Sequence, residues 1–226
     1  MDITDAVNKR KTFRGFKPDP VPQEILRELM GLALRAPSWA NTQPWEFAIV
    51  TGKKLEEIRQ GFIQKAAEEP HPDLAFPRVF PEPYLSRLPA MRRGPEAAKR
   101  RDDKEFRKEM RLQGARLYGV PCVIYIHTDR SFYLQQGESV NVYSVFDCGL
   151  IAENIMLLAV KYGLGTVPAA QAVMYPDVIR RVLGLPDSRL IVLGIGIGYP
   201  DMNHPQSQVY STREPLDKVT KWYGFD

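Results

Sequence analysis

The chain has 226 residues, of which 44% are hydrophobic and 26% charged, and its formal net charge is +4. This composition is typical of a soluble globular protein with a substantial core, and it argues against disorder over most of the length. No composition shift divides the chain cleanly, so we expect a single domain over residues 1–226.

The chain carries few signals of export, membrane insertion or metal binding. Its first residues lack a basic stretch followed by an apolar run, and no window reaches the ~18 apolar residues that span a bilayer. We therefore expect a cytoplasmic protein without membrane contact. Cys122 and Cys148 lie in apolar stretches without CxxC spacing, so we interpret them as buried hydrophobic residues, and no metal site is predicted. The scattered histidines (His71, His127 and His204) are assigned no catalytic role.

Helical and extended patterns alternate in the first half of the chain. Residues 2–10 have the pattern of a short helix, and Val21-Pro22-Gln23-Glu24 opens a second helix with proline in its first turn. Trp45 begins an alternating strand pattern, and residues 53–68 are again helical. Repeated prolines then break regular structure between residues 70 and 95.

A strongly basic stretch follows at residues 92–116. Such a stretch is compatible with nucleic-acid binding. Acidic residues are nevertheless interleaved at helical neighbour spacings, as in an exposed helix that side-chain pairs stabilise; they are Asp102, Asp103, Glu105 and Glu109. We favour the exposed helix, because the stretch contains no recognised nucleic-acid motif.

The second half of the chain begins with an apolar run at residues 121–126 that fits a strand covered on both faces. We expect a surface loop over residues 129–140, and a buried helix that starts at Asp147 as its N-cap. Residues 176–183 predict a further helix, and residues 190–199 an interior strand whose glycines permit close approach by another group. The mixture indicates a layered α and β domain without fixing the strand order.

Residues 36–45, Ala-Pro-Ser-Trp-Ala-Asn-Thr-Gln-Pro-Trp, are the most informative about function. Pro37 ends the preceding helix, so the chain turns there. Asn41 and Gln43 carry amides with both donor and acceptor capacity, which suits the polar edge of a flavin or a nucleobase. Because Asn, Ser and Pro are also ordinary turn residues, a plain polar loop is an equal alternative.

Three further segments carry candidate binding residues. Residues 9–14, Lys-Arg-Lys-Thr-Phe-Arg, combine cations with a hydroxyl, as a phosphate site requires, but basic residues also complement a helix C-terminus. The glycines of residues 162–170 close a helix, so they disfavour a Rossmann dinucleotide site and fit a helix cap. In residues 210–217, Arg213 lies beside two hydroxyl side chains, for which a surface turn is the simpler interpretation.

Taken in order, these segments resemble the FMN-dependent nitroreductase family. The likeness runs from the basic cluster with Thr12 and Arg14 through Asn-x-Gln-Pro-Trp, Asp147-x-Gly149, Gly-Leu-Gly-Thr and Gly-Tyr-Pro-Asp to Ser-Thr-Arg-Glu-Pro-Leu. It covers nearly the whole chain. The motif from Asn41 to Trp45 is the most specific part.

The resemblance implies an α+β fold with a central mixed sheet flanked by helices. It also implies a homodimer with extended C-terminal exchange and FMN at its interface. The residues expected to hold the ribityl phosphate are Arg10, Lys11, Thr12, Arg14 and Arg213. Those expected to line the flavin from the other subunit are Pro37, Ser38, Asn41 and Gln43. Pro168, Ala169 and Ala170 are expected along the isoalloxazine ring, and Gln113 stands near where many relatives place an asparagine.

The activity implied by the resemblance is a two-step transfer of reducing equivalents. NAD(P)H passes a hydride to flavin N5, and a nitroaromatic or similar electrophilic acceptor then takes the electrons, so no catalytic side chain is required. Residues 70–116 are the expected lid or insert over the flavin, and Arg92 and Arg93 within it would favour anionic acceptors. The alternatives are a reductase of another acceptor (a reductive dehalogenase or a quinone or enone reductase), a flavin-binding protein without turnover, and a basic nucleic-acid-binding module.

Overall fold

The computed structural model describes residues 1–88, 103–134 and 140–225, and its centre is one four-stranded sheet. The strand order is β1-β2-β4-β3, in which β1 is Glu46–Thr51, β2 is Cys122–Asp129, β3 is Gly165–Ala169 and β4 is Arg189–Gly198. All neighbouring strands pair antiparallel, and one isolated parallel bridge joins Thr12 to Thr166. The expected α+β fold is confirmed, but the described sheet is antiparallel where a mixed sheet was expected.

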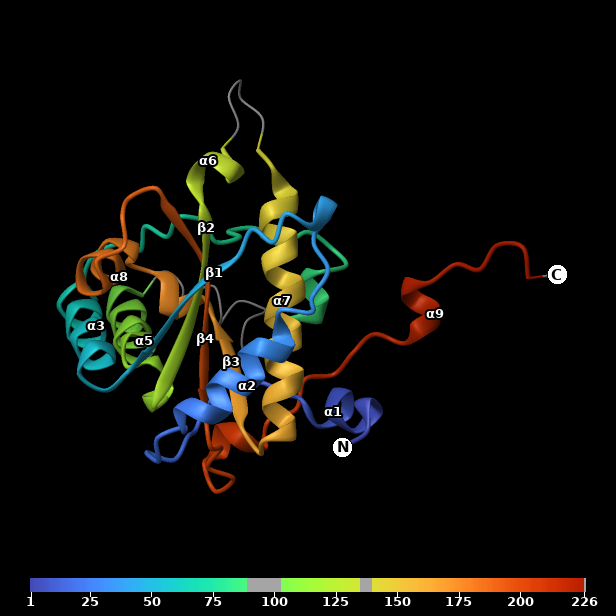
Figure 1. The fold of residues 1–226 in the computed structure, drawn as a ribbon, viewed down its shortest axis with the longest axis horizontal. Coiled ribbons are helices and arrows are strands. Elements are labelled where there is room, and N and C mark those ends of the chain that lie inside the picture. Colours follow the sequence, from blue (N-terminus) through green and yellow to red (C-terminus); the bar gives the residue numbers. More distant parts are fainter. Residues whose placement is uncertain (89–102, 135–139, 226) are drawn as a thin grey trace.

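Helices cover both faces of this sheet (Figure 1). On one face lie α2 (Gln23–Ala33) and α7 (Val142–Lys161), with α1 (Ile3–Lys9) beside α7. On the other face lie α3 (Gly52–Gln64), α5 (Lys104–Ala115) and α8 (Pro176–Leu183). The shorter described helices are η1 (Trp39–Asn41), η2 (Leu85–Arg87), η4 (Leu117–Gly119), α6 (Arg130–Tyr133), η5 (Ala170–Val173), η6 (Pro205–Gln208) and α9 (Leu216–Val219).

Strand β2 supplies both hydrophobic cores, because alternate residues of a strand point to opposite faces. Ile124 and Ile126 belong to the core under α2 and α7, whereas Val123 and Tyr125 belong to the core under α3 and α8. All four side chains are buried. The prediction of a strand covered on both faces is therefore confirmed.

The glycines of β4 allow the close approach that the sequence predicted. A Cβ atom added to Gly194 would lie 2.5 Å from the Cβ of Ala172 in η5. The group that approaches is thus the segment directly after β3 of the same chain. This contact seats residues 170–173 against the sheet.

The second half of the fold differs from the sequence expectation in two places and extends it in a third. α7 begins at Val142 instead of Asp147, and its N-cap is Asn141, whose side chain accepts a hydrogen bond from the Tyr143 N–H (3.1 Å). The expected loop at 129–140 contains α6, while residues 135–139 lie outside the described chain. The predicted glycine cap is present, since Gly163 has a φ of 68° directly after the C-cap residue of α7. The segment then continues into β3, where Gly165 pairs with Gly198 of β4.

By length and composition alone α7 could cross a bilayer, although polar residues such as Asp147 and Glu153 interrupt its apolar sequence. A core helix meets the same criterion, and one side of α7 buries Cys148, Ile151 and Ile155 against the sheet. On its outer side Tyr143 and Phe146 are exposed. Its apolar composition is therefore explained by one face in the core and a second face that is open to another surface.

Both cysteines are free and buried, as expected. Burial raises the pKa of the Cys122 thiol to about 12. Burial and then the charge of Asp147 raise the pKa of the Cys148 thiol to about 12 as well. Both thiols stay protonated at neutral pH, so they act as small hydrophobic side chains.

The expected insert is fixed to the core at its N-terminal end. The buried carboxylate of Asp73 accepts hydrogen bonds from Arg130 (2.9 Å), from Arg180 and from the N–H of Ile191 (2.8 Å). Both arginines come from the other side of the expected insert in sequence. Residue 73 thus belongs to the core and not to a movable cover.

The other described end of the insert is fixed as well. Arg111 of α5 donates to the side chain of Glu69 (2.6 Å) and to the carbonyl of Glu68 (2.9 Å). His71 Nε2 lies 2.8 Å from Asp177 of α8. The basic helix is thus exposed over residues 103–109, as expected, and is fixed near its C-terminal end by Arg111 and by the buried Gly114 and Ala115. Arg92 and Arg93 lie outside the described residues.

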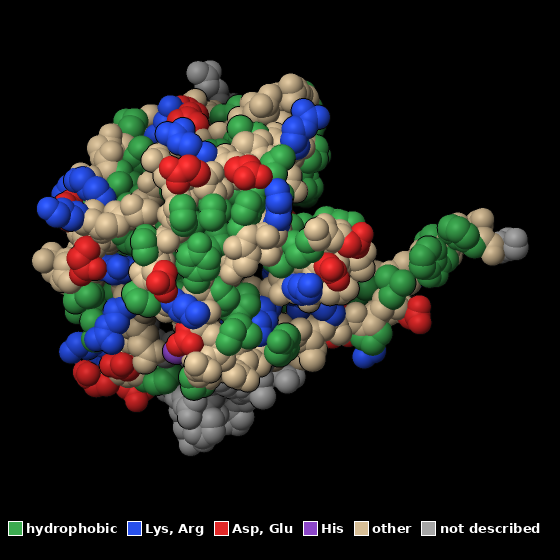
Figure 2. All heavy atoms as spheres, turned by 60° about the horizontal axis from the view of Figure 1, so that its bottom comes forward, with side chains coloured by type: hydrophobic (Ala, Val, Ile, Leu, Met, Phe, Trp, Pro, Cys, Tyr) green, Lys and Arg blue, Asp and Glu red, His purple; other side chains and the backbone are tan. Residues whose placement is uncertain are grey.

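The chain after residue 208 leaves the body and extends away from it (Figures 1 and 2). Its hydrophobic side chains are exposed: Tyr210, Leu216, Val219, Trp222, Tyr223 and Phe225. α9 contains no buried residue. We refer to residues 209–225 as the C-terminal arm.

Candidate functional site

The basic cluster at residues 10–14 lies where α1 ends beside α7. Arg10 Nε forms an ion pair with Glu153 of α7 (3.0 Å). Lys11 Nζ donates to the carbonyl of Ser207 (2.6 Å) and lies 3.8 Å from the ring centroid of Tyr210. The cluster therefore has a built framework, with cations held by a helix and by the start of the C-terminal arm.

A short bridge joins this cluster to β3. The Phe13 N–H donates to the Thr166 carbonyl (3.0 Å), and a Cβ on Gly165 would lie 2.7 Å from the Phe13 ring. Gly165 is therefore needed for this close packing. Thr12 forms the isolated bridge with Thr166. The cations and the hydroxyl are thus fixed at the beginning of the strand.

The opposite end of β3 carries the segment expected along the flavin. Pro168 and Ala170 are exposed, and Ala169 between them is buried. The path from Thr166 to Ala170 is about 13 Å at ~3.3 Å per residue. A ligand with a phosphate at one end and a flat ring at the other could lie along this strand, so these residues fit FMN.

The loop at residues 37–43 has an unusual backbone. Ala40, Asn41 and Gln43 all have positive φ angles, of 49°, 57° and 47°. Such angles are uncommon outside glycine and cost roughly 1–3 kcal/mol each unless the surroundings enforce them. Residues held this way cluster at functional sites. The structure therefore favours a binding loop over a plain polar turn.

Hydrogen bonds inside the loop hold its two amides. Ser38 Oγ accepts from the Gln43 N–H (2.9 Å), and Gln43 Nε2 donates to Asn41 Oδ1 (3.2 Å). Asn41, Gln43 and Pro37 are exposed, and Ser38 is half-buried. The amides are thus arranged but remain accessible to a ligand.

One acidic residue of α7 anchors the loop to the core. Asp147 Oδ2 accepts a hydrogen bond from the Trp39 N–H (3.0 Å), and the Asp147 side chain is buried. Beside this bond, the exposed rings of Trp39 and Tyr143 lie 6.0 Å apart, and those of Tyr143 and Phe146 lie 6.5 Å apart. The loop and the first turns of α7 form one unit.

Loop and basic cluster contact different parts of α7. The loop bonds to Asp147, near the N-terminal end of the helix, and Arg10 bonds to Glu153 further along. Within the described chain, no hydrogen bond or ion pair joins the loop to the basic cluster. One subunit therefore places the basic cluster next to β3, but its loop at residues 37–43 lies elsewhere along α7.

The sequence matches one known protein family over most of its length. The model of the Nitroreductase family matches residues 7–199, which is most of the chain. The protein is a member of the nitroreductase family. The match spans the basic cluster, the loop, β3 and β4, and it ends just before the segment that leads to the C-terminal arm.

Full-length relatives support this membership of the nitroreductase family. The chain is 30% identical to a nitrobenzene nitroreductase of Ectopseudomonas oleovorans, over 96% of this chain and 95% of the relative. It is 28% identical to a 4-nitrobenzoate reductase of Pseudomonas putida, over 100% and 97%. The crystal structure of the FMN and NADPH-dependent nitroreductase NfnB from Sphigopyxis sp. strain HMH matches with a TM-score of 0.84, 28% identity and full coverage of both chains.

Gln113 and Arg213, the last two predicted cofactor-binding residues of this nitroreductase, lie at the edges of the site. Gln113 is exposed on α5, where it donates to Glu109 (3.2 Å). Its neighbour Gly114 packs so closely on Gln171 that an added Cβ would lie 2.7 Å from that side chain. α5 thus runs along η5, beside the segment expected to contact the flavin, and Gln113 is within the same region.

Arg213 lies on the C-terminal arm. Its Nη1 donates to the carbonyls of Ser211 (3.2 Å) and Thr212 (3.1 Å), and its side chain is exposed. Arg14 of the basic cluster is half-buried. Arg213 follows Tyr210, whose ring covers Lys11, so the arm begins next to the expected phosphate residues.

Sequence reasoning missed two contributors to the nitroreductase site. Ser207 is fully buried and its carbonyl holds Lys11, a role for which a Pro-Gln-Ser segment gives no signal. Asp147 was interpreted as a helix cap, and its bond to the Trp39 N–H, 108 residues away, could not be read from the local pattern. Among the described residues, no group of His, Cys, Asp or Glu side chains could hold a metal ion.

Proposed function

We propose that this nitroreductase is an NAD(P)H-dependent flavin oxidoreductase that binds FMN and reduces nitroaromatic compounds or similar electrophilic acceptors. Relatives named for nitrobenzene and 4-nitrobenzoate reduction, and a structural neighbour named as FMN and NADPH-dependent, support this activity. The observation that carries the proposal is the bridge from Thr12 to Thr166, which joins the basic cluster to a strand that leads to Ala170. We also propose a cytoplasmic location.

Bound FMN would supply the redox chemistry, by taking a hydride from NAD(P)H and returning electrons to the acceptor. The residues of the protein would bind FMN and orient it. Arg10, Lys11, Arg14 and Arg213 compensate the phosphate charge, and the Thr12 hydroxyl donates a hydrogen bond to it. The amides of Asn41 and Gln43 supply donors and acceptors to the polar edge of the ring system. The small exposed side chain of Ala170 lets the ring approach the backbone, whereas Ala169, whose side chain is buried in the core, offers only its backbone.

The active unit in this proposal is a homodimer in which each FMN contacts both subunits. Support comes from the separation of the loop and the basic cluster on α7, since a complete site then needs the loop of a second copy. The exposed aromatic residues at the start of α7 supply an apolar surface for such a contact. Large exposed apolar patches commonly mark protein interfaces.

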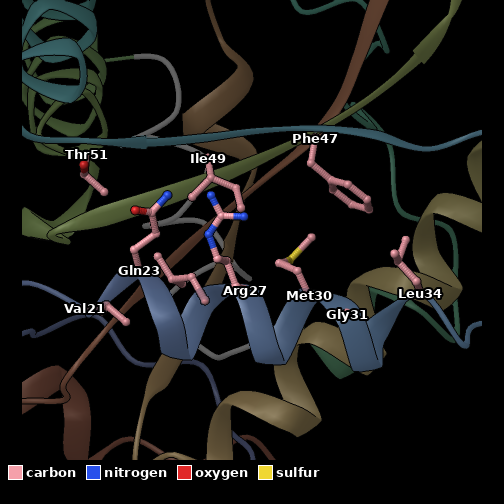
Figure 3. Close-up of a pocket in the computed structure, with 10 residues that line it drawn as sticks. Val21, Gln23, Arg27, Met30, Gly31, Leu34, Phe47, Ile49 and Thr51 are labelled. Atoms are coloured by element: carbon pink, nitrogen blue, oxygen red, sulfur yellow. The ribbon is translucent and has the colours of Figure 1, made fainter.

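A groove between α2 and β1 offers a seat for the C-terminal arm of the second copy (Figure 3). Its volume is about 710 Å³. Arg27 and Met30 rise from α2 toward β1, and Phe47 and Ile49 point back toward α2. β1 is an edge strand, whose unpaired backbone groups can bind an added extended segment. The exposed apolar side chains of the arm suit this lining.

The test is reconstitution of the purified protein with FMN. The expected result is a yellow dimer with one FMN per subunit, bleached anaerobically by NADPH or NADH and recoloured by nitrobenzene or 4-nitrobenzoate. A protein that stays colourless at saturating FMN overturns the proposal. A yellow protein that nicotinamide cannot bleach supports the flavin-binding alternative. Faster recolouring by a quinone or a halogenated substrate than by nitroaromatics supports another acceptor.

A further inference from the structure

The bond between Asp147 and Trp39 gives the loop at residues 37–43 a function beyond binding. Asp147 lies in the second turn of α7, 108 residues along the chain from Trp39, and its side chain is buried. Its carboxylate oxygen accepts the N–H of Trp39, the residue that begins η1. Hydrogen bonds to a charged acceptor are roughly twice as strong as neutral ones.

The hydrogen bond to Asp147 fixes Trp39, which directly precedes the residues of the loop with positive φ. Ala40, Asn41 and Gln43 have positive φ, and inside the loop only weak neutral hydrogen bonds oppose their relaxation. The Asp147 bond is a link with a charged acceptor between this loop and the core, whereas the Trp39 side chain is 60% exposed and provides little packing of its own. Without the bond, the loop would keep no charged anchor that holds these angles.

We propose that Asp147 is a positioning residue for the flavin, because it enforces the loop conformation that presents the Asn41 and Gln43 amides. The inference rests on the proposed FMN function. It adds a residue that does not touch the cofactor, and it assigns the strained backbone to that residue. Preorganised donors bind more tightly because the cost of ordering them is met during folding.

The chain offers a conservative variant and a matched control. Asp147→Asn keeps one acceptor oxygen for the Trp39 N–H, whereas Asp147→Ala removes it. Asn154→Ala is the control, because Asn154 lies on the same helix and also bonds to a backbone group, the Ala33 carbonyl (3.3 Å). That bond reaches the end of α2 and not the strained loop. It therefore reports on general loosening around α7.

Two measurements test the proposal. The first is hydrogen exchange of the amides of residues 38–43 in the FMN-free protein, which does not depend on the cofactor. The second is the FMN dissociation constant with the absorption spectrum of the bound flavin. In Asp147→Ala we expect faster exchange confined to the loop and an FMN dissociation constant raised about 10-fold or more, as for loss of a charged hydrogen bond. Asp147→Asn keeps a neutral bond to the Trp39 N–H, so both changes should be smaller than in Asp147→Ala.

The outcomes separate this inference from the proposed function. A wild-type protein that fails to bind FMN overturns the proposed function, and with it a positioning effect on the flavin. If the wild type binds FMN, unchanged loop exchange and unchanged affinity in Asp147→Ala overturn the inference alone. Equal losses in Asp147→Ala and Asn154→Ala also overturn it, because the effect would then be general. If Asp147→Ala does not fold, Asp147→Asn decides, because it keeps an acceptor oxygen but loses the charge. Faster loop exchange and weaker FMN binding than in Asn154→Ala support the inference, and loop exchange and affinity equal to those of Asn154→Ala overturn it.

Discussion

The start of the insert and the C-terminal arm differ in how they are attached to the body of the protein. Residues 68–73 are tied to the core by Arg111, Arg130, Arg180 and the backbone of Ile191. The arm exposes its large apolar side chains and contains no buried residue in α9.

The difference shows where the stability of each segment originates. The insert start is stabilised within one chain, by a buried carboxylate that satisfies two guanidinium groups and a backbone donor. The arm lacks enough contacts of its own to order such an apolar segment, since fixing each residue costs roughly 1–2 kcal/mol. Its order must come from a second surface, for which the groove between α2 and β1 is the candidate.

Removal of residues 216–226 is expected to have the largest effect on assembly. The truncation keeps Arg213 but removes Leu216, Val219, Trp222 and Tyr223. Because burying a large apolar side chain contributes about 1.5–3 kcal/mol, the dimer dissociation constant should rise by roughly 100-fold or more. Light scattering after size-exclusion chromatography measures this. The circular dichroism of the body should change little, and an unchanged dimer would show that the arm is not the connecting element.

The groove can be tested from the other side through Gly31. A Cβ at this position meets no atom within 4 Å, so larger side chains fit without displacing the core. Gly31→Trp fills the groove and should weaken the dimer, whereas Gly31→Ala leaves the groove open and favours the helix by about 1 kcal/mol. Equal dimer affinity in both variants would exclude the groove as the seat of the arm.

Asp73→Ala should instead affect folding within one chain. It leaves Arg180 buried without its carboxylate, and loss of one partner of a buried pair costs about 3–5 kcal/mol. The free energy of unfolding from urea titration measures this loss. Glu57→Ala is the control, because Glu57 pairs with Lys54 on the surface (3.0 Å) and should cost under about 1 kcal/mol. Similar losses in both variants would contradict a special role of the buried network.

Arg213→Ala probes the point where the arm meets the basic cluster. Its loss leaves the phosphate charge less compensated, and a hydrogen bond to a charged group contributes about 1.5–3 kcal/mol. FMN affinity should therefore fall by roughly 10- to 100-fold while the dimer persists, as measured by fluorescence titration and light scattering. Unchanged affinity would remove Arg213 from the phosphate site.

The smallest expected effect concerns Asp177, which holds His71 at the insert start. Burial raises the pKa of Asp177, but hydrogen bonds from Lys65 and His71 outweigh it, so the pKa lies below its ordinary value of 3.8. A lowered carboxyl pKa stabilises the protein above pH 3.8, and this contribution is lost as the pH falls below that value. Asp177→Asn should cost under about 0.5 kcal/mol at pH 7, because the pair is partly exposed, and the cost should shrink as the pH falls below 3.8. A cost that stays constant as the pH falls would exclude titration of Asp177 as its cause.

Local sequence patterns predicted most elements because their causes are local. The predicted helix at 176–183 has proline in its first turn, and α8 has the same bounds. The apolar run at 121–126 predicted a strand, and β2 covers Cys122–Asp129. The start of α7 was wrong, because Asn141 caps it from within a polar stretch that has no helical periodicity. β3 was missed because its identity depends on pairing with β4, which is distant in sequence.

The residue types of the candidate site were predictable, but its geometry was not. Cations with a threonine indicated phosphate, and paired amides indicated a flat polar ligand. The positive φ angles of the loop depend on Asp147, and the position of Lys11 depends on Ser207, so each results from contacts more than 100 residues apart. Such contacts leave no periodic signal in one sequence.

The strand order has a consequence for biosynthesis. β2 lies between β1 and β4, so its second edge stays unpaired until residues 189–198 have been made. During that interval the apolar run at residues 122–126 is exposed on a growing chain, and long-range strand pairing is intrinsically slow. The emerging polypeptide is therefore most prone to aggregation, and most dependent on chaperones, just before β4 leaves the ribosome.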